Sequence, residues 1–348
     1  MEGCPATDLQ TDRALGALLG VAIGDAMGMP SQTWSRETIR SVYGEITDFA
    51  EASPDQPVSA GLKAGAITDD TEQSLLLARH LIERQGGFDE HIWARSLLDW
   101  ERDMRARGLK DLLGPSTRRA IEALSRGVPA DEVGRFGTTN GAAMRIAPVG
   151  IATALEPLSA FVDAVATTCR LTHNTSAAIG SAAAVAAVIS AGVSGSDFEH
   201  ALPTALAAAR LGERRGAGPT GALISERIER ALALAEGKAG REAAVAAAME
   251  IGTSVSALES VPMAFAIARL AGHDTWRAAI LSAHIGDDTD TIGAISGGMC
   301  GACEGAAALP ADKVSLILSV NRLDLAPTIE GLLRLRKAKS QAERTGAS

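Results

Sequence analysis

Two stretches of the sequence place several carboxylates directly before an apolar, helix-like segment. The first, "TDDTEQSLLLARHL", covers residues 68–81, and the second, "HIGDDTDTIGAISGG", covers residues 284–298. Capping explains one or two acids at such a place, because side-chain oxygens accept bonds from free backbone N–H groups and the helix dipole favours negative charge there. Asp69 followed by Glu72 also fits a capping box. The first stretch alone is therefore compatible with a purely structural role.

The second stretch needs more than capping. Asp287, Asp288 and Asp290 are close neighbours in the sequence. Three partly buried carboxylates repel one another, which raises their pKa values unless a cation or strong donors compensate. Hard divalent cations take oxygen ligands such as carboxylates, hydroxyls and carbonyls. If the two stretches meet in space, they can hold two metal ions roughly 3.5–4 Å apart, and for the pair of stretches we prefer this interpretation to capping.

The composition limits the classes to which the protein can belong. The 348 residues carry 33 Lys and Arg against 42 Asp and Glu, a formal net charge of −9, which argues against nucleic acid as the main partner. Residues 1–13 lack the regions of a secretory signal, and the small-residue segment 176–195 predicts a buried helix rather than a membrane span. Cys300 and Cys303 have the spacing of half a zinc site without its second half, which favours two buried thiols. We expect a cytoplasmic protein without a membrane partner.

Apolar residues recur at helical spacing along nearly the whole chain. Clear examples are residues 12–28, 71–85, 91–104 and 116–127. Alternation with period two is scarce, and the low aromatic content of 3%, together with many small residues, suits closely packed helices. The sequence predicts a single compact all-α domain over residues 1–348, with an ordered core of about 10–338.

Five motifs resemble, in their order along the chain, those of the ADP-ribosylglycohydrolases, an all-α family typified by dinitrogenase reductase-activating glycohydrolase. They are "GALLGVAIGDAMGMP" (16–30), "AITDDTE" (66–72), "TTNGAAMRIAPVG" (138–150), "LTHNTSAAI" (171–179) and "GDDTDTIGAISGGM" (286–299). The resemblance extends over nearly the whole chain. It implies the orthogonal multi-helix fold of that family and an enzyme that cleaves the bond at the anomeric carbon of a ribose.

The resemblance also implies two Mg²⁺ ions, with Mn²⁺ as the alternative metal. The implied ligands are Thr68, Asp69, Asp70, Asp288, Asp290 and Thr291. The metals would orient the ribose hydroxyls and activate a water, while carboxylates stabilise an oxocarbenium-like transition state. Asp69, Asp70 and Asp290 are the predicted catalytic residues, and the sequence does not separate Asp69 from Asp70 as the base. Asp287, at a position where the family usually has glycine, is expected to be exposed or to lie behind the ligands.

A loop for the substrate's phosphates is implied by the same resemblance. The predicted substrate-binding residues are Gly137, Thr138, Thr139, Asn140, Gly141, His173 and Gln32. Backbone N–H groups of residues 137–141 would cradle an anion, with Asn140 holding the shape of the loop. His173 has either a structural role or a contact with substrate, and Arg145 either anchors the following helix or touches substrate. Asp25 interrupts an apolar run and is expected to be buried and hydrogen-bonded near the site.

Besides Asp287, other residues depart from the family pattern, including those around the histidine in "THNTS". Gln32 stands where many members carry glutamate, and an amide cannot take a proton from water. Thr138 stands where several relatives carry an aromatic residue, and Thr139 where the family usually has glycine. The leading prediction is Mg²⁺-dependent hydrolysis of an N- or O-ribosyl glycosidic bond, with removal of ADP-ribose from a modified side chain such as arginine. The alternatives are hydrolysis of a small ribosylated metabolite or nucleoside, and a non-catalytic ADP-ribose-binding protein.

Overall fold

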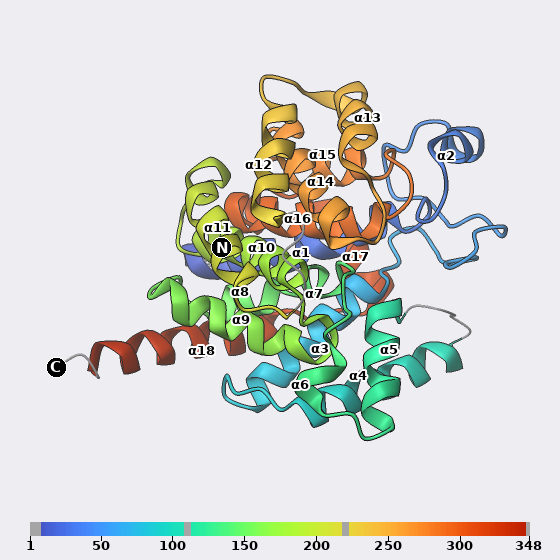
Figure 1. Cartoon of the computed structure of the whole chain (residues 1–348). Helices are drawn as coiled ribbons and strands as arrows, with labels where there is room; N and C mark the ends of the chain where they lie inside the picture. The colour runs from blue at the N-terminus through green and yellow to red at the C-terminus, as the bar shows by residue number, and fades with distance from the viewer. Residues whose placement is uncertain (1–7, 108–112, 218–222, 346–348) are drawn as a thin grey trace, which may run out of the picture.

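The computed structural model describes residues 8–107, 113–217 and 223–345, and within these ranges the chain forms helices and no β-strand (Figure 1). The all-α prediction is confirmed. The elements are α1 (Leu9–Gly28), α2 (Arg36–Tyr43), α3 (Asp69–Glu83), α4 (Glu90–Ala106), α5 (Pro115–Ser125), α6 (Ala130–Val133), α7 (Gly141–Met144), α8 (Ala147–Ala152), α9 (Leu158–His173), α10 (Ser176–Val193), α11 (Phe198–Glu213), α12 (Ile224–Ala235), α13 (Gly240–Ile251), α14 (Ala257–Leu270), α15 (Thr275–Ser282), α16 (Thr289–Glu304), the 3₁₀ helix η1 (Ala306–Ala308), α17 (Ala311–Asn321) and α18 (Ala326–Thr345).

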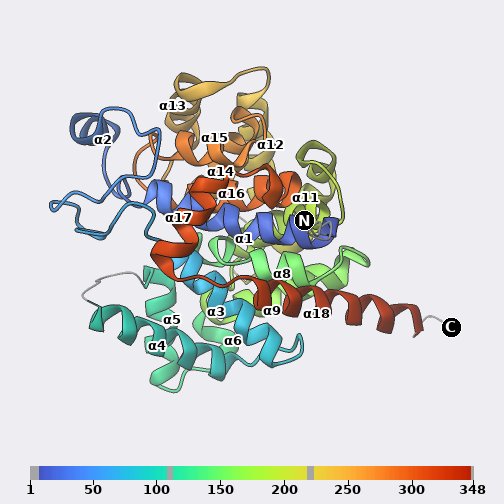
Figure 2. The ribbon, with the colours of Figure 1, turned by 180° about the vertical axis from the view of Figure 1, so that it is seen from behind.

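Helices α1 and α16 form the centre of the fold and pack along each other (Figures 1 and 2). Each has glycines four residues apart, which therefore lie on one helix face. They are Gly16, Gly20, Gly24 and Gly28 on α1, and Gly293, Gly297 and Gly301 on α16. A Cβ added at Gly24 would lie 1.9 Å from the Gly293 carbonyl oxygen, and one at Gly28 would lie 2.4 Å from the Asp290 Cα. Only glycine permits this approach, which fixes the start of α16 against α1.

The core around this pair is completed by helices that are apolar on all sides. Helix α10 is long and apolar enough to cross a membrane by composition, but 89% of it is buried inside the protein, as expected for a core helix. The prediction of a buried helix is confirmed. Cys300 and Cys303 are also buried, on α16, and burial raises the pKa of the Cys303 thiol to about 12. Both thiols are therefore small core residues.

Three segments that are far apart in the sequence meet at one end of the α1–α16 pair. They are the start of α3, the start of α16, and the loop that leads into α7. A hydrogen bond of 3.4 Å joins Thr291 on α16 to Asp70 on α3. Another, of 2.5 Å, joins Asn140 before α7 to Asp288 before α16. The fold thus brings both acidic stretches and the predicted substrate loop to one place.

Candidate active site

Helix α3 is capped by a carboxylate from another helix. Asp25 on α1 is fully buried and accepts bonds from the backbone N–H groups of Thr68 at 2.9 Å and Thr71 at 3.1 Å. It also accepts from both threonine hydroxyls, at 2.7 and 2.5 Å. The expectation of a buried, hydrogen-bonded Asp25 is confirmed. Because Asp25 satisfies these N–H groups, α3 does not need Asp69 or Asp70 as caps.

Four aspartates, two from each acidic stretch, lie together, and of these Asp290 accepts a bond from the Thr291 N–H at 2.9 Å. Asp288 precedes α16 and makes no side-chain cap bond. Burial first, and neighbouring carboxylates next, raise the pKa of Asp69 to about 8. Burial raises the pKa of Asp288 to about 7. The pKa values of Asp70 and Asp290 are raised well above their usual range by burial and then by nearby aspartates. Mutual repulsion of this kind shows that the four groups share one electrostatic environment.

The donor atoms fit a hard cation. The Asp70 Oδ1 atom is buried and has no hydrogen-bond partner among the described residues, and every predicted ligand offers oxygen. The Thr68 hydroxyl donates to Asp25, which leaves its lone pairs free to accept. In the described part of the chain, no three His, Cys, Asp or Glu side chains already stand at the mutual distances of a metal site. Sharing one ion therefore requires rotation of these carboxylates.

A cavity of about 160 Å³ opens at the carboxylates. Its wall includes Asp69, Asp288, Asp290 and Thr291. Of the predicted substrate-binding residues, those that line it are Gln32, Thr139, Asn140 and Gly141. Gly137, Thr138 and His173 do not line this cavity. His173 is fully buried, with its Nε2 atom 2.9 Å from the Thr139 Oγ1 atom, so Thr139 lies between the imidazole and the cavity.

The loop before α7 is held by its own hydrogen bonds. The Gly137 N–H donates to the Gly134 carbonyl at 2.9 Å, and the Asn140 N–H donates to the Val255 carbonyl at 2.9 Å. The Asn140 amide donates to Asp288 at 2.5 Å and to Ser260 at 2.9 Å. Asn140 thus holds the loop and positions a carboxylate. Because two backbone N–H groups are already bonded, the predicted anion cradle is smaller than expected.

A match to a known family covers almost the whole chain. The family model described as ADP-ribosylglycohydrolase matches residues 6–342. This chain belongs to the ADP-ribosylglycohydrolase family. Its members hydrolyse glycosidic bonds, and the chain is an enzyme of this class.

Individual relatives agree with the family assignment. YegU of Escherichia coli, an uncharacterized protein, is 35% identical over 95% of this chain and 99% of its own length. The ADP-ribosylarginine hydrolase Tri1 of Pseudomonas putida is 28% identical over 92% of this chain and 80% of its own. A solved ADP-ribosylglycohydrolase-related protein complex has a TM-score of 0.64 and 25% identity, covering 94% of this chain and 98% of that one. The predicted family and fold are confirmed.

The turn after α1 supplies a neutral, buried amide to the cavity wall of this ADP-ribosylglycohydrolase. Gln32 is only 7% exposed, and its Nε2 atom is buried without a hydrogen-bond partner among the described residues. The Gln56 amide fixes the turn by donating to the Gln32 carbonyl at 2.9 Å. Thr33 has a φ of 64° and Asp287 one of 63°. A left-handed backbone costs a β-branched residue such as Thr33 about 1–3 kcal/mol. The two left-handed residues are hydrogen-bonded to each other, because the Thr33 N–H donates to the Asp287 carbonyl at 2.6 Å. Asp287 is exposed, as expected.

Several residues at the site were not predicted from the sequence, and three of them bear on its hydrogen bonds and on the turn after α1. Gln73 and Thr33 line the cavity, and Ser260 on α14 supports Asn140. Gln73 lies four residues after Asp69 and so shares its helix face, a spacing that was visible in the sequence. Thr33 adjoins the predicted Gln32. Ser260 had no signal, because its contact joins residues 120 positions apart.

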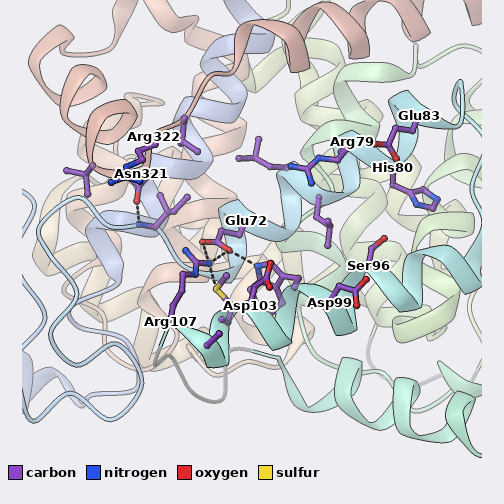
Figure 3. A pocket seen from close by; sticks show the side chains of 18 residues that line it. Glu72, Arg79, His80, Glu83, Ser96, Asp99, Asp103, Arg107, Asn321 and Arg322 are labelled. Carbon is purple, nitrogen blue, oxygen red and sulfur yellow. Dashed lines mark hydrogen bonds and ion pairs between the residues drawn. The ribbon is translucent and has the colours of Figure 1, made fainter.

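A second and larger hollow, of about 930 Å³, lies along α3 and α4 near the end of α17 (Figure 3). Its carboxylates are either exposed or already bonded. Glu72 accepts hydrogen bonds from the Trp100 indole at 2.6 Å and from Arg107 at 2.9 Å, while Glu83, Asp99 and Asp103 are exposed. This hollow has no group of buried, unpaired acids. The smaller cavity, where such acids converge, is therefore the candidate active site.

Proposed function

We propose that this ADP-ribosylglycohydrolase uses Mg²⁺ to hydrolyse an N- or O-ribosyl bond, most simply to remove ADP-ribose from a modified side chain such as arginine. The observation that carries the proposal is the group formed by Asp69, Asp70, Asp288 and Asp290. Among the described residues, these carboxylates form no ion pair with Lys or Arg, and their pKa values are raised. The relative named ADP-ribosylarginine hydrolase supports arginine as the modified residue.

The four aspartates would hold the metals together with the hydroxyls of Thr68 and Thr291. Bound there, Mg²⁺ supplies positive charge that orients the ribose hydroxyls and makes a bound water more acidic. Mn²⁺ is the alternative metal, since it takes the same oxygen ligands. The buried, unpartnered Oδ1 of Asp70 is the oxygen most in need of a cation.

The cavity wall favours Asp69 over Asp70 as the general base. Asp69 lines the cavity, whereas Asp70 is fully buried. The Gln73 amide donates to Asp69 Oδ2 at 3.4 Å, which leaves Oδ1 to take a proton from an attacking water. Asp288 and Asp290 also line the cavity, where their negative charge would stabilise an oxocarbenium-like transition state.

The test is release of ADP-ribose from a peptide that carries ADP-ribosylated arginine. We expect release with Mg²⁺ and none after EDTA, with restoration when Mg²⁺ is returned. The matched pair of variants is Asp69→Asn and Asp103→Asn, of which only the first changes the proposed site. Equal activity of the wild type with and without EDTA would contradict the metal-dependent mechanism.

A smaller substrate is the second candidate, supported by the size of the cavity and by Gln32. Ligand pockets commonly measure roughly 300–1,000 Å³, whereas this cavity measures about 160 Å³. A neutral amide at Gln32 also gives the wall a different chemistry from a carboxylate. Cleavage of a nucleoside or of another small ribosylated metabolite, without cleavage of the modified peptide, would favour this candidate.

A further inference from the structure

A buried guanidinium links two walls of the cavity. Arg145 is 2% exposed, lies 5.6 Å from the centre of the Trp93 ring, and forms no ion pair with any carboxylate among the described residues. Its two terminal nitrogens donate instead to neutral side chains. One bond of 2.7 Å reaches Gln73 Oε1, and another of 2.6 Å reaches Thr172 Oγ1. Burying a charge without a direct counter-ion is costly, so this arrangement calls for a reason.

The first bond fixes the orientation of Gln73. A glutamine amide can turn either its oxygen or its nitrogen toward a neighbour. Because a guanidinium carries only donors, it holds the Gln73 oxygen on its own side. The Gln73 Nε2 atom then faces Asp69, 3.4 Å from its Oδ2 atom. Arg145 therefore makes Gln73 a donor toward the carboxylate on the cavity wall.

The second bond starts a chain of buried hydrogen bonds to the opposite wall. Thr172 Oγ1 accepts from Arg145 and lies 2.7 Å from His173 Nδ1, to which its own hydrogen can be donated when Nδ1 carries no proton. Burial first, and Arg145 next, hold the pKa of His173 well below its usual value, so the ring is neutral and has one N–H. When Nδ1 accepts from Thr172, that hydrogen is on Nε2, which lies 2.9 Å from Thr139 Oγ1 and can donate to it.

Thr139 is the end of this chain and lines the cavity. In this arrangement its oxygen accepts from His173, and its hydrogen is free to point into the cavity. We propose that Arg145 is a positioning residue that fixes hydrogen-bond direction at both walls, so that Thr139 meets the ligand as a donor and selects an oxygen acceptor, such as a phosphate oxygen. The choice of ADP-ribose as ligand rests on the proposed function, but the direction of the bonds does not.

The bond direction can be measured without any ligand, by nitrogen NMR of histidine-labelled full-length protein. The chain has 6 histidines, and His173→Asn identifies the signal of interest by its loss. We expect His173 to be neutral with its proton on Nε2 at pH 7. A proton on Nδ1, or a doubly protonated ring, would overturn the proposal. This result stands whether or not ADP-ribose proves to be the ligand.

The consequence for binding is tested by calorimetry with ADP-ribose and Mg²⁺. Thr139→Val and Thr172→Val should each weaken binding roughly tenfold, as for loss of one hydrogen bond to a charged group. The double variant should be no weaker than either single variant, because both break the same chain. Thr139→Ser should restore binding.

Thr168→Val is the matched control, since Thr168 is buried on α9 one turn before Thr172 and donates only to the Val165 carbonyl at 2.8 Å. We expect it to bind ADP-ribose like the wild type. If Thr172→Val bound ADP-ribose with the same affinity as Thr168→Val, Thr172 would have no effect on the hydrogen bond at Thr139, and the proposal would fail. If the wild type bound no ADP-ribose, the ligand of the proposed function would be wrong, and the NMR result would still decide the bond direction.

Discussion

Helix α3 contributes residues to two hollows of very different character. In the larger one (Figure 3), the carboxylate of Glu72 is held by Trp100 and Arg107, and the remaining acids are exposed to solvent. In the smaller one, Asp69 stands beside the buried Asp288 and Asp290. The two hollows measure about 930 and 160 Å³. Only the smaller one holds buried carboxylates that form no ion pair with Lys or Arg among the described residues.

The difference shows that a group of buried carboxylates without ion-pair partners is a better guide to the active site than the volume of a hollow. A carboxylate in water or beside an arginine is already satisfied, so it has no need of a ligand. Buried acids that repel one another are stable only when protonated or when a cation binds. The account therefore predicts that changes in the small cavity alter chemistry, and that changes in the large hollow do not.

Asp290→Asn should have the largest effect. Loss of this carboxylate is expected to lower kcat/KM by roughly 10²–10³-fold or more, the scale of removing one charge-stabilising group from an active site. The helical circular dichroism should stay unchanged, because the asparagine has the same shape. Steady-state kinetics on a ribosyl substrate measures the effect. Turnover equal to that of the wild type would remove Asp290 from the mechanism.

Gly28→Ala tests the support of the same carboxylate. The added Cβ would lie 2.4 Å from the Asp290 Cα, so the start of α16 must shift. We expect a loss of about 1–3 kcal/mol in the free energy of unfolding, as for other overpacked sites, together with weaker Mg²⁺ binding. Chemical denaturation and metal titration measure the two effects. Unchanged values of both would show that the α1–α16 contact does not position Asp290.

The pH dependence of stability should reveal the raised pKa values directly. Burial raises the pKa of Asp25 to about 6, of Asp288 to about 7 and of Asp69 to about 8, from the usual aspartate value of 3.8. The folded state thus binds more protons than the unfolded state between about pH 4 and pH 8, and stability falls as pH rises through this window. In EDTA, the melting temperature should drop by at least roughly 2 °C from pH 5.5 to pH 8, the shift that corresponds to about 1 kcal/mol.

Added Mg²⁺ should reverse this loss, with a larger gain at pH 8 than at pH 5.5, because the metal competes with protons for the same carboxylates. The control variant Asp103→Asn, in the large hollow, should keep the wild-type slope. A melting temperature that rises with pH in EDTA would contradict the raised pKa values of these buried carboxylates.

Gln32→Glu should have a moderate effect on the substrate that is cleaved. A carboxylate at this wall position can take a proton, which the amide cannot, so we expect removal of ADP-ribose from modified arginine to rise roughly tenfold. Gln32→Met, which removes the amide without adding an acid, should give no gain. No gain with Gln32→Glu would favour the smaller substrate.

Glu72→Gln should have the smallest effect. Arg107 and Glu72 form an ion pair that is partly exposed, with side chains 53% and 20% accessible, and such pairs contribute about 0–1 kcal/mol. We expect unchanged turnover and a change in stability below about 1 kcal/mol. A large loss of turnover would show that the hollow in Figure 3 takes part in the reaction and would overturn the comparison.

Local patterns in the sequence were enough to predict the two acidic helix starts. Apolar spacing predicted a helix over 71–85, and the structure has it as Asp69–Glu83. The helix begins earlier because Asp25, more than forty positions before it, supplies the cap. A contact of that range cannot be derived from local spacing, and the same is true of the Asn140–Asp288 bond.

Backbone conformation and burial explain the other differences. The left-handed Thr33 is forced by its bond to the Asp287 carbonyl, which no propensity of threonine would suggest. For His173 the sequence left open a structural role or a contact with substrate, and the structure places its Nε2 atom 2.9 Å from Thr139 Oγ1, away from the cavity wall. The spacing of the α1 glycines was visible in the sequence, but its meaning depended on the matching stripe on α16.

The most direct test of the central claim is calorimetric titration of ADP-ribose into the full-length protein, first with Mg²⁺ and then after EDTA. The account predicts binding with Mg²⁺, no binding after EDTA, and no binding by Asp290→Asn with Mg²⁺ present. Binding of equal strength in Mg²⁺ and in EDTA would contradict the claim that the four aspartates form a metal-dependent site for a ribosyl ligand.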